Sequence, residues 1–266
     1  FLMKIADIHA HIFPDALAAK ATHSIASFYH DDIMDCRPAS LSCLLQEHRA
    51  AGITCGVVCS SATTPAQVRH INDFIAKTAH ENPQYLGFGS VYPGMPGVED
   101  ELDRMLSLGL RGIKIHPEFQ KLAIDAPEAV DTYRAIAKRG LPVLFHMGDA
   151  HSDLSSPERL LHLLRQVPDL RPIAAHFGGW QSWQHAYEHP LPDPVVYDTS
   201  SSTALLSVDM VLRFLDRYGE DRLLFGTDFP MWKPLDAVNE LRALHLGRAT
   251  EEKLFYGNFA RYFGLQ

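Results

Sequence analysis

Two histidines near the start of the chain have the spacing of a metal site. The sequence DIHAH, residues 7–11, lies in an apolar run over residues 4–12 that predicts a β-strand. Side chains two residues apart on a strand share a face, so His9 and His11 can reach one ion. Because the chain contains 15 histidines, chance alone could also produce this pair. The pair becomes informative only together with residues elsewhere in the chain.

Three further residues that could take part in catalysis stand at the ends of other predicted strands. His146, His176 and Asp228 each close an apolar run, just before a glycine or a turn. In barrels of parallel strands, the carboxyl ends of the strands form the active-site rim. Chance is a poor explanation for four imidazoles and one carboxylate at one rim. Such donors suit zinc, and also manganese, iron, cobalt or nickel.

A metal held by three or four protein ligands has a position left for water. The ion lowers the pKa of that water from about 16 toward about 7, which makes hydroxide available at neutral pH. A carboxylate ligand can take the proton of this water, and a neighbouring histidine can stabilise a developing oxyanion or carry a proton. The donor set therefore predicts metal-assisted chemistry on a small-molecule substrate.

These residues need a scaffold that brings distant strand ends together. Eight short apolar runs alternate with about eight amphipathic stretches, and most runs are apolar on both parities, as in strands covered on both faces. The predicted strands span residues 4–12, 55–62, 85–93, 112–117, 142–149, 172–179, 195–201 and 223–230. The predicted helices span residues 40–51, 65–81, 98–108, 125–140, 156–167, 203–218, 234–244 and 249–262.

This alternation predicts an α/β fold, a slightly elaborated (β/α)8 TIM barrel that forms one domain over residues 1–266. The length of 266 residues suits one such barrel. The alternative is a doubly wound sheet, which often has a glycine-rich turn after its first strand. Here that turn reads HAHIFPD and contains no glycine, which favours the barrel.

Composition excludes several classes of partner. The net charge of -8 and the absence of a Lys/Arg run argue against nucleic acid. No apolar stretch reaches the length of a membrane span, and no signal peptide is recognised. Four cysteines lack CxxC spacing, and we expect them to be reduced, which indicates the cytoplasm. They are Cys36, Cys43, Cys55 and Cys59.

Six motifs in order resemble the amidohydrolase superfamily, in particular its amidohydrolase-related branch. They are DIHAHIFP, GIKIHP, FHMGD, AHFGGW, FGTDFP and YGNFARYFGL, and they cover nearly the whole chain. That branch includes aminocarboxymuconate semialdehyde decarboxylase, resorcylate-type decarboxylases and several lactone or ester hydrolases. HxH alone is a weak signal, whereas the ordered set is specific. Since members are often dimers or larger, the resemblance leaves a homodimer or higher homo-oligomer open.

The resemblance implies a role for each rim residue. His9, His11, His146 and Asp228 correspond to metal ligands, with zinc as the expected ion, and Asp228 also handles protons. His176 corresponds to a catalytic histidine that polarises the substrate or, in two-metal relatives, binds a second ion. One ion is favoured for this chain.

Lys114 decides between one ion and two. In two-metal relatives, a lysine on the fourth strand is carbamylated and bridges the ions, whereas decarboxylase-like relatives have no lysine there. A free Lys114 would instead bind a substrate carboxylate or hydrogen-bond within the site, which we favour, or face solvent. His116 shares its strand parity, and Trp180 and Trp232 follow rim residues. We count these four as substrate-binding candidates, with ordinary packing equally open for the two tryptophans.

Three polar residues are expected to support the site or to lie apart from it. Asp7 shares the parity of His9 but lies deeper, so we expect a buried, structural carboxylate. Asp198 in the sequence YDTSS is expected to scaffold the rim or to orient a ligand. His48 lies in a predicted helix, and we expect it at the surface.

Three functions are compatible with these features. The first is hydrolysis of a small lactone, ester or amide, with a carboxylate-bearing substrate expected. The second is metal-dependent, non-oxidative decarboxylation of a hydroxyaryl or unsaturated carboxylic acid. The third is a metal-binding scaffold without catalysis, which the intact ligand set argues against. Short connections at the rim favour hydrolysis over decarboxylation, by analogy with longer decarboxylases of this branch.

Overall fold

Eight apolar segments form the strands of one sheet. The computed structural model describes residues 3–29 and 37–265, and within these residues the strands follow one another in chain order. The pairs from β3 to β7 are parallel. The strands are β1 Ala6–His11, β2 Cys55–Cys59, β3 Tyr85–Gly89, β4 Gly112–Ile115, β5 Pro142–Phe145, β6 Arg171–Ala174, β7 Val196–Asp198 and β8 Leu223–Leu224.

The first strand also pairs with the segment that follows the last. The backbone N–H of Asp228 donates to the carbonyl of His9 (2.8 Å), and that of His11 donates to the carbonyl of Phe229 (2.7 Å). A sheet of eight parallel strands in chain order whose first and last members pair is the (β/α)8 TIM barrel. The predicted fold class is confirmed.

Helices occupy the stretches between the strands. They are α1 Asp15–Tyr29, α2 Leu41–Ala51, α3 Pro65–Glu81, α4 Val98–Ser107, α5 Pro117–Gln120, α6 Pro127–Lys138, α7 Pro157–Gln166, α8 Trp183–Glu188, α9 Val208–Tyr218, α10 Pro234–Ala243, α11 Arg248–Glu252 and α12 Asn258–Phe263. Ser40 caps α2 by accepting from the N–H of Cys43, and Gly52 ends it with a φ of 72°. In the described parts of the chain, no helix is both long enough and apolar enough to cross a bilayer.

The structure differs from the predicted elements at several ends and in three additional helices, α1, α5 and α8. Helix α1 was not predicted because the residues it buries, Ala18, Thr22 and Ala26, are too small to form a hydrophobic stripe. Helix α5 is a short turn that follows β4 directly. Strand β8 is only two residues long, and the pairing with β1 continues beyond it as an isolated parallel bridge between Ala10 and Phe229.

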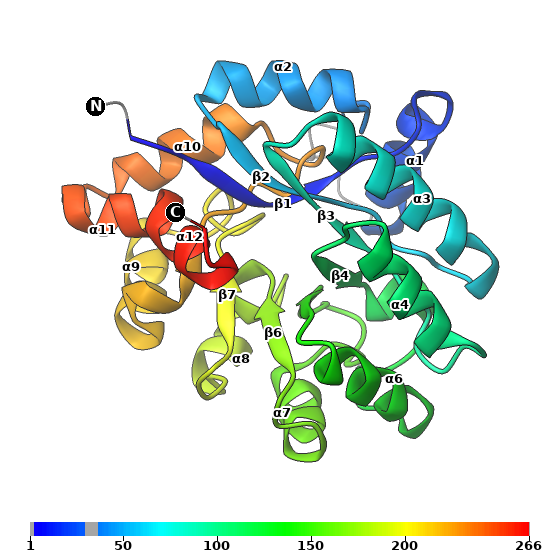
Figure 1. The fold of residues 1–266 in the computed structure, drawn as a ribbon. Helices are drawn as coiled ribbons and strands as arrows, with labels where there is room; N and C mark the ends of the chain where they lie inside the picture. The colour runs from blue at the N-terminus through cyan, green and yellow to red at the C-terminus, as the bar shows by residue number, and fades with distance from the viewer. Residues whose placement is uncertain (1–2, 30–36, 266) are drawn as a thin grey trace. The chain divides into compact units, whose positions relative to one another are not determined.

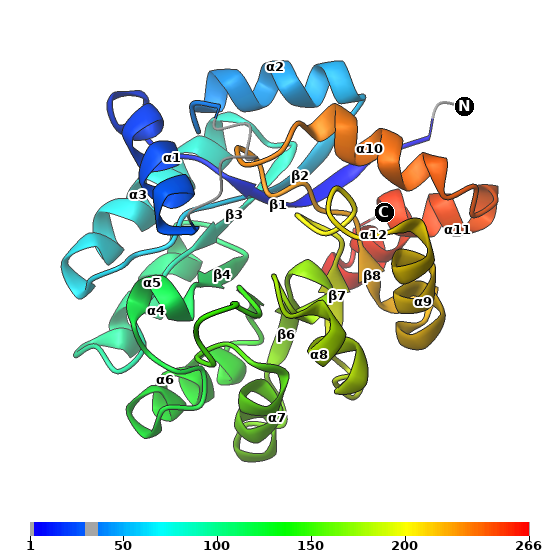
Figure 2. The same cartoon turned by 180° about the vertical axis from the view of Figure 1, so that it is seen from behind.

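The contacts divide the chain into two compact units, which are described separately. The first comprises residues 1–58 and 198–266, and the second comprises residues 59–197. In the first unit, α10 packs against α2 (Figures 1 and 2). In the second unit, α3 packs along β3, and α4 packs against α6 (Figure 1). That the whole chain forms one domain stays a prediction.

The Asp7 carboxylate joins three segments of the first unit. Its Oδ1 accepts from the backbone N–H groups of His9 and Thr227, both at 2.9 Å. Its Oδ2 accepts from the Thr227 hydroxyl (2.5 Å) and from Nε2 of His48 in α2 (3.1 Å). The predicted burial of Asp7 is confirmed and its structural role stays a prediction, whereas the prediction of a surface His48 is wrong. Leu44, His48 and Ala51 share the buried face of α2.

Replacing Asp7 by Asn is expected to lower the free energy of unfolding by about 3 kcal/mol, because an amide nitrogen cannot accept from donors that the carboxylate satisfies in the core. Chemical denaturation of the variant and the parent measures the difference. Asp15→Asn, in the exposed first turn of α1, is the control and should cost less than about 1 kcal/mol. Equal losses in the two variants would contradict this role of Asp7.

Candidate active site

His9, His11 and Asp228 form a compact group of metal-ligand atoms, here called the His9 cluster. Nε2 of His9 lies 3.1 Å from Nε2 of His11, and Oδ1 of Asp228 lies 3.5 Å and 3.4 Å from these two atoms. His9 is almost completely buried, while His11 and Asp228 keep 12% and 14% of their side chains exposed. The cluster therefore has a closed side and an open side.

Asp198 fixes the orientation and the tautomer of His9. Its Oδ2 lies 2.9 Å from Nδ1 of His9, and since a carboxylate only accepts, Nδ1 carries the proton. Nε2 of His9 is then a lone pair that faces the cluster. Oδ1 of Asp198 accepts from the backbone N–H (3.0 Å) and hydroxyl (2.6 Å) of Ser200. A carboxylate behind a histidine in this way is the usual support of a metal ligand.

Asp228 is held by a short chain of hydrogen bonds. The Trp232 indole N–H donates to the Ser201 hydroxyl (2.8 Å), which donates to Oδ2 of Asp228 (2.5 Å). The other oxygen, Oδ1, is left to face the two histidines. The φ of Asp228 is 58°, in a region that few residues other than glycine occupy. Such backbone strain persists where the surroundings fix it, commonly at functional sites.

The His9 cluster fits a divalent transition metal. Ligands about 2.0–2.1 Å from a tetrahedral ion lie roughly 3.3 Å apart, close to the separations of these three atoms. Two imidazole nitrogens and one carboxylate oxygen are also the donors that zinc and similar ions prefer. Without a cation, the His9 lone pair would point toward a carboxylate oxygen. These residues are therefore a sound candidate metal centre.

In the second unit, His116, His146 and His176 lie together, here called the His146 cluster. Nε2 of His146 lies 3.0 Å from the carbonyl of Gly148 and must donate to it, so Nδ1 is the lone pair. That Nδ1 lies 3.1 Å from Nε2 of His176. The rings of His116 and His146 stack at 4.0 Å. The atom of His146 that could bind a metal is thus Nδ1, which the sequence could not specify.

His176 occupies a strained turn after β6. It and Phe177 have φ values of 60° and 51°, in the left-handed region. The ring of His176 contacts that of Trp180, and the Trp183 indole donates to its carbonyl (3.1 Å). Trp180 is itself buried against Trp183. In this unit the predicted catalytic histidine therefore stands beside one of the two predicted tryptophans.

Lys114 and His116 are both buried at the end of β4. Lys114 is fully buried, so the solvent-facing alternative is wrong. The charge of Lys114 acts on Glu118, a neighbour that was not predicted. His116 caps α5 by accepting from the N–H of Phe119 at 3.5 Å and stacks on that ring. A substrate role for Lys114 and His116 stays a prediction.

Glu118 is a buried acid beside the His146 cluster. Burial raises the pKa of Glu118 to about 7, although the hydrogen bond from the Ser155 hydroxyl to Oε1 (2.5 Å) acts in the opposite direction. Its Oε2 lies 3.7 Å from Nδ1 of His116. Glu118 follows His116-Pro117 directly in the sequence, but only the fold reveals its burial.

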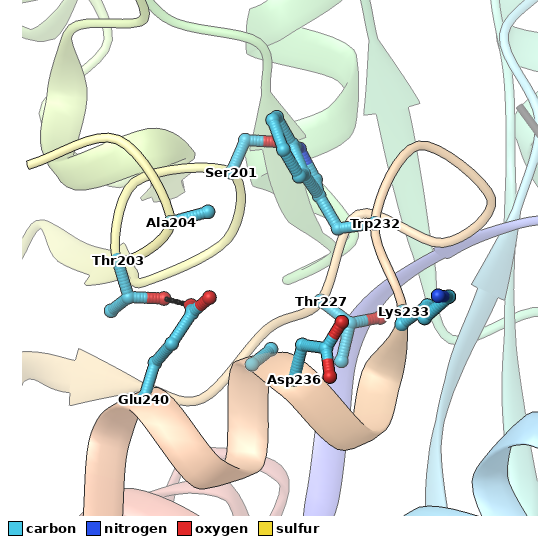
Figure 3. A pocket seen from close by; sticks show the side chains of 9 residues that line it. Ser201, Thr203, Ala204, Thr227, Trp232, Lys233, Asp236 and Glu240 are labelled. Atoms are coloured by element: carbon cyan, nitrogen blue, oxygen red, sulfur yellow. Dashed lines mark hydrogen bonds between the residues drawn. The ribbon is translucent and has the colours of Figure 1, made fainter. Parts of the chain in front are cut away.

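A pocket of about 300 Å³ lies in the first unit, next to the segment that holds Asp228 (Figure 3). Ser201, Thr227 and Trp232 line it together with Asp236 and Glu240 of α10. The prediction that Trp232 lines a pocket is therefore supported by the structure. Ser201 was not predicted, and its only sequence signal was its place after YDTS.

Asp198→Asn is expected to weaken metal binding about 10–100-fold, because an amide no longer fixes the His9 tautomer. Competition with a chelator of known affinity measures the change, and far-ultraviolet circular dichroism verifies folding. Asp209→Asn, at an exposed position in α9, is the matched control and should bind as the parent does. Unchanged affinity in Asp198→Asn would show that Asp198 does not support the ligand.

Glu118 predicts a pH dependence of stability in metal-free protein. The unfolded chain releases this proton near pH 4.5 and the folded chain near pH 7, so the parent loses stability as pH rises through that window. The loss should reach roughly 3 kcal/mol, and Glu118→Gln should lack it. Denaturation at pH 5 and pH 8 measures the difference between the two proteins. If the free energies of unfolding of the parent and of Glu118→Gln differ by the same amount at both pH values, the buried-acid interpretation is contradicted.

Comparison with solved structures shows the same fold. 5-Carboxyvanillate decarboxylase LigW from Sphingomonas paucimobilis is 16% identical, with a TM-score of 0.73 and full coverage of both chains. A protein from Pseudomonas putida described as a 2-pyrone-4,6-dicarboxylic acid hydrolase is 19% identical, with a TM-score of 0.71 and coverage of 99% and 98%. A dihydroxybenzoic acid decarboxylase from Polaromonas sp. JS666, solved with manganese, is 16% identical, with a TM-score of 0.71 and coverage of 99% and 97%.

No curated protein matches the chain. The sequence model described as Amidohydrolase matches residues 6–265, which is nearly the whole chain and includes every residue of both clusters. The similar structures include decarboxylases and a described hydrolase, and at these identities they show the fold alone. The family match does not depend on them, and the chain belongs to the amidohydrolase family.

Proposed function

We propose that this protein is a metal-dependent hydrolase of a small lactone, ester or amide that carries a carboxylate. The observation that carries the proposal is the His9 cluster, in which three ligand atoms lie 3.1–3.5 Å apart. The support of His9 by Asp198 and of Asp228 by Ser201 adds to it. Metal dependence is also a property of the amidohydrolase family.

His9, His11 and Asp228 would hold the ion, and the sequence adds His146 as a further ligand. We propose zinc, with manganese, iron, cobalt and nickel as alternatives that the donors also suit. When bound, such an ion lowers the pKa of water and polarises a carbonyl group. One ion per chain is proposed, because three ligands already converge without Lys114. A carbamylated Lys114 remains the route to a second ion.

Asp228 is the proposed proton acceptor. Its Oδ2 is occupied by the Ser201 hydroxyl, so Oδ1 is the oxygen that takes the proton of the attacking water. The strained backbone of Asp228 limits the freedom of the carboxylate, which keeps Oδ1 aimed at the cluster. His176 is the proposed partner that donates a hydrogen bond to the developing oxyanion and a proton to the leaving group.

The substrate contacts are proposed from burial and charge. Lys114 would pair with a substrate carboxylate, because a buried ammonium group binds an anion strongly. His116, Trp180 and Trp232 are the other proposed contacts, and Trp232 lines the pocket of the first unit (Figure 3). A small-molecule substrate and a cytoplasmic location belong to the same proposal. Of the four cysteines, Cys36 lies outside the described residues, and the expectation that the cysteines are reduced stays a prediction.

Decarboxylation is the second candidate. Two of the similar structures reported above are aryl-acid decarboxylases, and the chain spans them as completely as it spans the described hydrolase. The same residues would serve both reactions: Asp228 or His176 would deliver a proton to carbon instead of removing one from water. The share of each chain that the comparisons cover does not distinguish the two reactions, so the reaction products have to be identified.

The decisive experiment incubates the metal-loaded protein with lactones, esters, amides and hydroxyaryl carboxylates. Hydrolysis is followed by the release of acid, and decarboxylation by the release of carbon dioxide. We expect about one transition metal ion per chain and acid release that a chelator abolishes and added zinc restores. Carbon dioxide release without hydrolysis would replace the first candidate with the second. A protein that never binds metal, with metal content unchanged in His11→Ala, would refute both.

Asp228→Asn is expected to reduce turnover by about 10²–10⁴-fold, because an amide cannot accept the proton. Steady-state kinetics on the substrate found above measures the loss, and metal analysis distinguishes lost proton transfer from lost metal. Asp209→Asn, at an exposed position in α9, is the control for the change of charge. Full activity in Asp228→Asn would remove Asp228 from the reaction.

A further inference from the structure

Three ligand-type side chains converge at the surface of the second unit, where α7 meets α8. Glu158 lies in the first turn of α7, His185 lies in α8, and His189 ends that helix. Each side chain is about half exposed, between 46% and 48%. None of them takes part in the chemistry proposed above. Together they are called the α7–α8 cluster.

The distances place all three ligand atoms around one small volume. Oε1 of Glu158 lies 2.8 Å from Nε2 of His185 and 3.6 Å from Nε2 of His189. The two rings are four residues apart on one helix, and their centroids lie 4.2 Å apart. These separations bracket the roughly 3.3 Å between ligands of a tetrahedral ion. Two imidazoles from α8 and one carboxylate from α7 thus face a common point.

The backbone selects the tautomer of His189. Its Nδ1 lies 2.9 Å from the carbonyl of His185, and since a carbonyl only accepts, Nδ1 carries the proton. In the neutral ring, Nε2 is then a lone pair directed toward the same Glu158 oxygen that His185 contacts. This arrangement is the carbonyl-supported geometry typical of histidine metal ligands.

Nε2 of His185, Nε2 of His189 and Oε1 of Glu158 face one point, so a cation there can replace the single hydrogen bond that His185 donates to Glu158. An exposed ion pair between His185 and Glu158, worth about 0–1 kcal/mol, accounts for the position of one histidine and its proton. It leaves the second lone pair facing the carboxylate. A divalent ion satisfies all three groups together.

We propose that Glu158, His185 and His189 form a second metal site, which binds a divalent transition ion such as Zn²⁺, Cu²⁺, Ni²⁺ or Co²⁺ and links α7 to α8. Imidazole donors favour these ions over Mg²⁺ and Ca²⁺. With three protein ligands at the surface, the remaining positions are open to water or to another molecule. The site is independent of the proposed reaction, because none of its residues belongs to the His9 or the His146 cluster.

The chain offers a matched control on the same helix. His162 of α7 is 58% exposed, and its Nδ1 lies 2.7 Å from Oδ2 of Asp125. It is an exposed histidine–carboxylate pair like that of Glu158 and His185. Among the described residues, the groups of three or more ligand-type side chains include Glu158, His185 and His189, but not His162. His162→Ala therefore removes a surface histidine and leaves the proposed site intact.

The test titrates zinc-loaded protein, freed of loose metal by gel filtration, with Zn²⁺ or Cu²⁺ in a calorimeter. We expect one further ion per chain in the parent and in His162→Ala, and the loss of that ion in His185→Ala and His189→Ala. Electron paramagnetic resonance of the added Cu²⁺ should show two nitrogen ligands in the parent. Glu158→Gln should weaken binding while it retains both nitrogen couplings. Mg²⁺ should give no binding.

Three outcomes would overturn the proposal. If the parent takes up no further ion, the three groups form an ion pair only. If His189→Ala binds the ion as the parent does, the site lies elsewhere. If His162→Ala also loses the ion, binding is a general property of surface histidines. Because the altered residues are exposed, circular dichroism should show folded protein throughout, and the zinc already loaded should stay bound in every variant.

Discussion

The buried carboxylate of Asp7 is the interaction on which the His9 cluster depends. One oxygen of Asp7 holds the backbone of both His9 and Thr227, and therefore ties the strand that carries two ligands to the segment that carries the third. Its other oxygen is anchored by His48 and the Thr227 hydroxyl. A buried charge is tolerated only where donors surround it, and here four donors do. The positions of His9 and Asp228 follow from this one bonding pattern.

Three of the four proposed metal ligands each have a supporting hydrogen bond. Asp198 sets the proton on His9, Ser201 occupies one oxygen of Asp228, and the Gly148 carbonyl sets the proton on His146. Each support removes an alternative protonation state or rotamer, so the ligand atoms are arranged before an ion arrives. The positive φ values of Asp228 and His176 are interpreted in the same way, as backbone strain that fixes the orientation of a side chain. The strained backbone lowers the stability of the fold but holds the side chains in fixed orientations, as is common at functional sites.

Hydrolysis and decarboxylation differ in where a proton is transferred, and the same residues are proposed for both reactions. Asp228 and His176 are proposed to remove a proton from water or to deliver one to carbon, because a group that accepts a proton at a given position can also donate one there. The amidohydrolase family match identifies the scaffold, but it does not determine which of the two reactions takes place. The second unit also contains two buried ionisable groups, Lys114 and Glu118, and of these Lys114 is the one proposed to bind an anionic substrate.

The sequence by itself determined the alternation of strands and helices, the barrel, and the candidate ligands at the strand ends. These follow from local rules: hydrophobic periodicity gives the elements, and a parallel barrel gathers the carboxyl ends of its strands. It did not give α1, whose buried residues are small, or the burial of His48, which the stripe Leu44, His48 and Ala51 indicates only in retrospect. Only the tertiary structure decided which nitrogen of His9 and His146 is the lone pair, and that Ser201 holds Asp228. Those properties depend on partners distant in the chain or on the exact backbone path, and no local pattern encodes them.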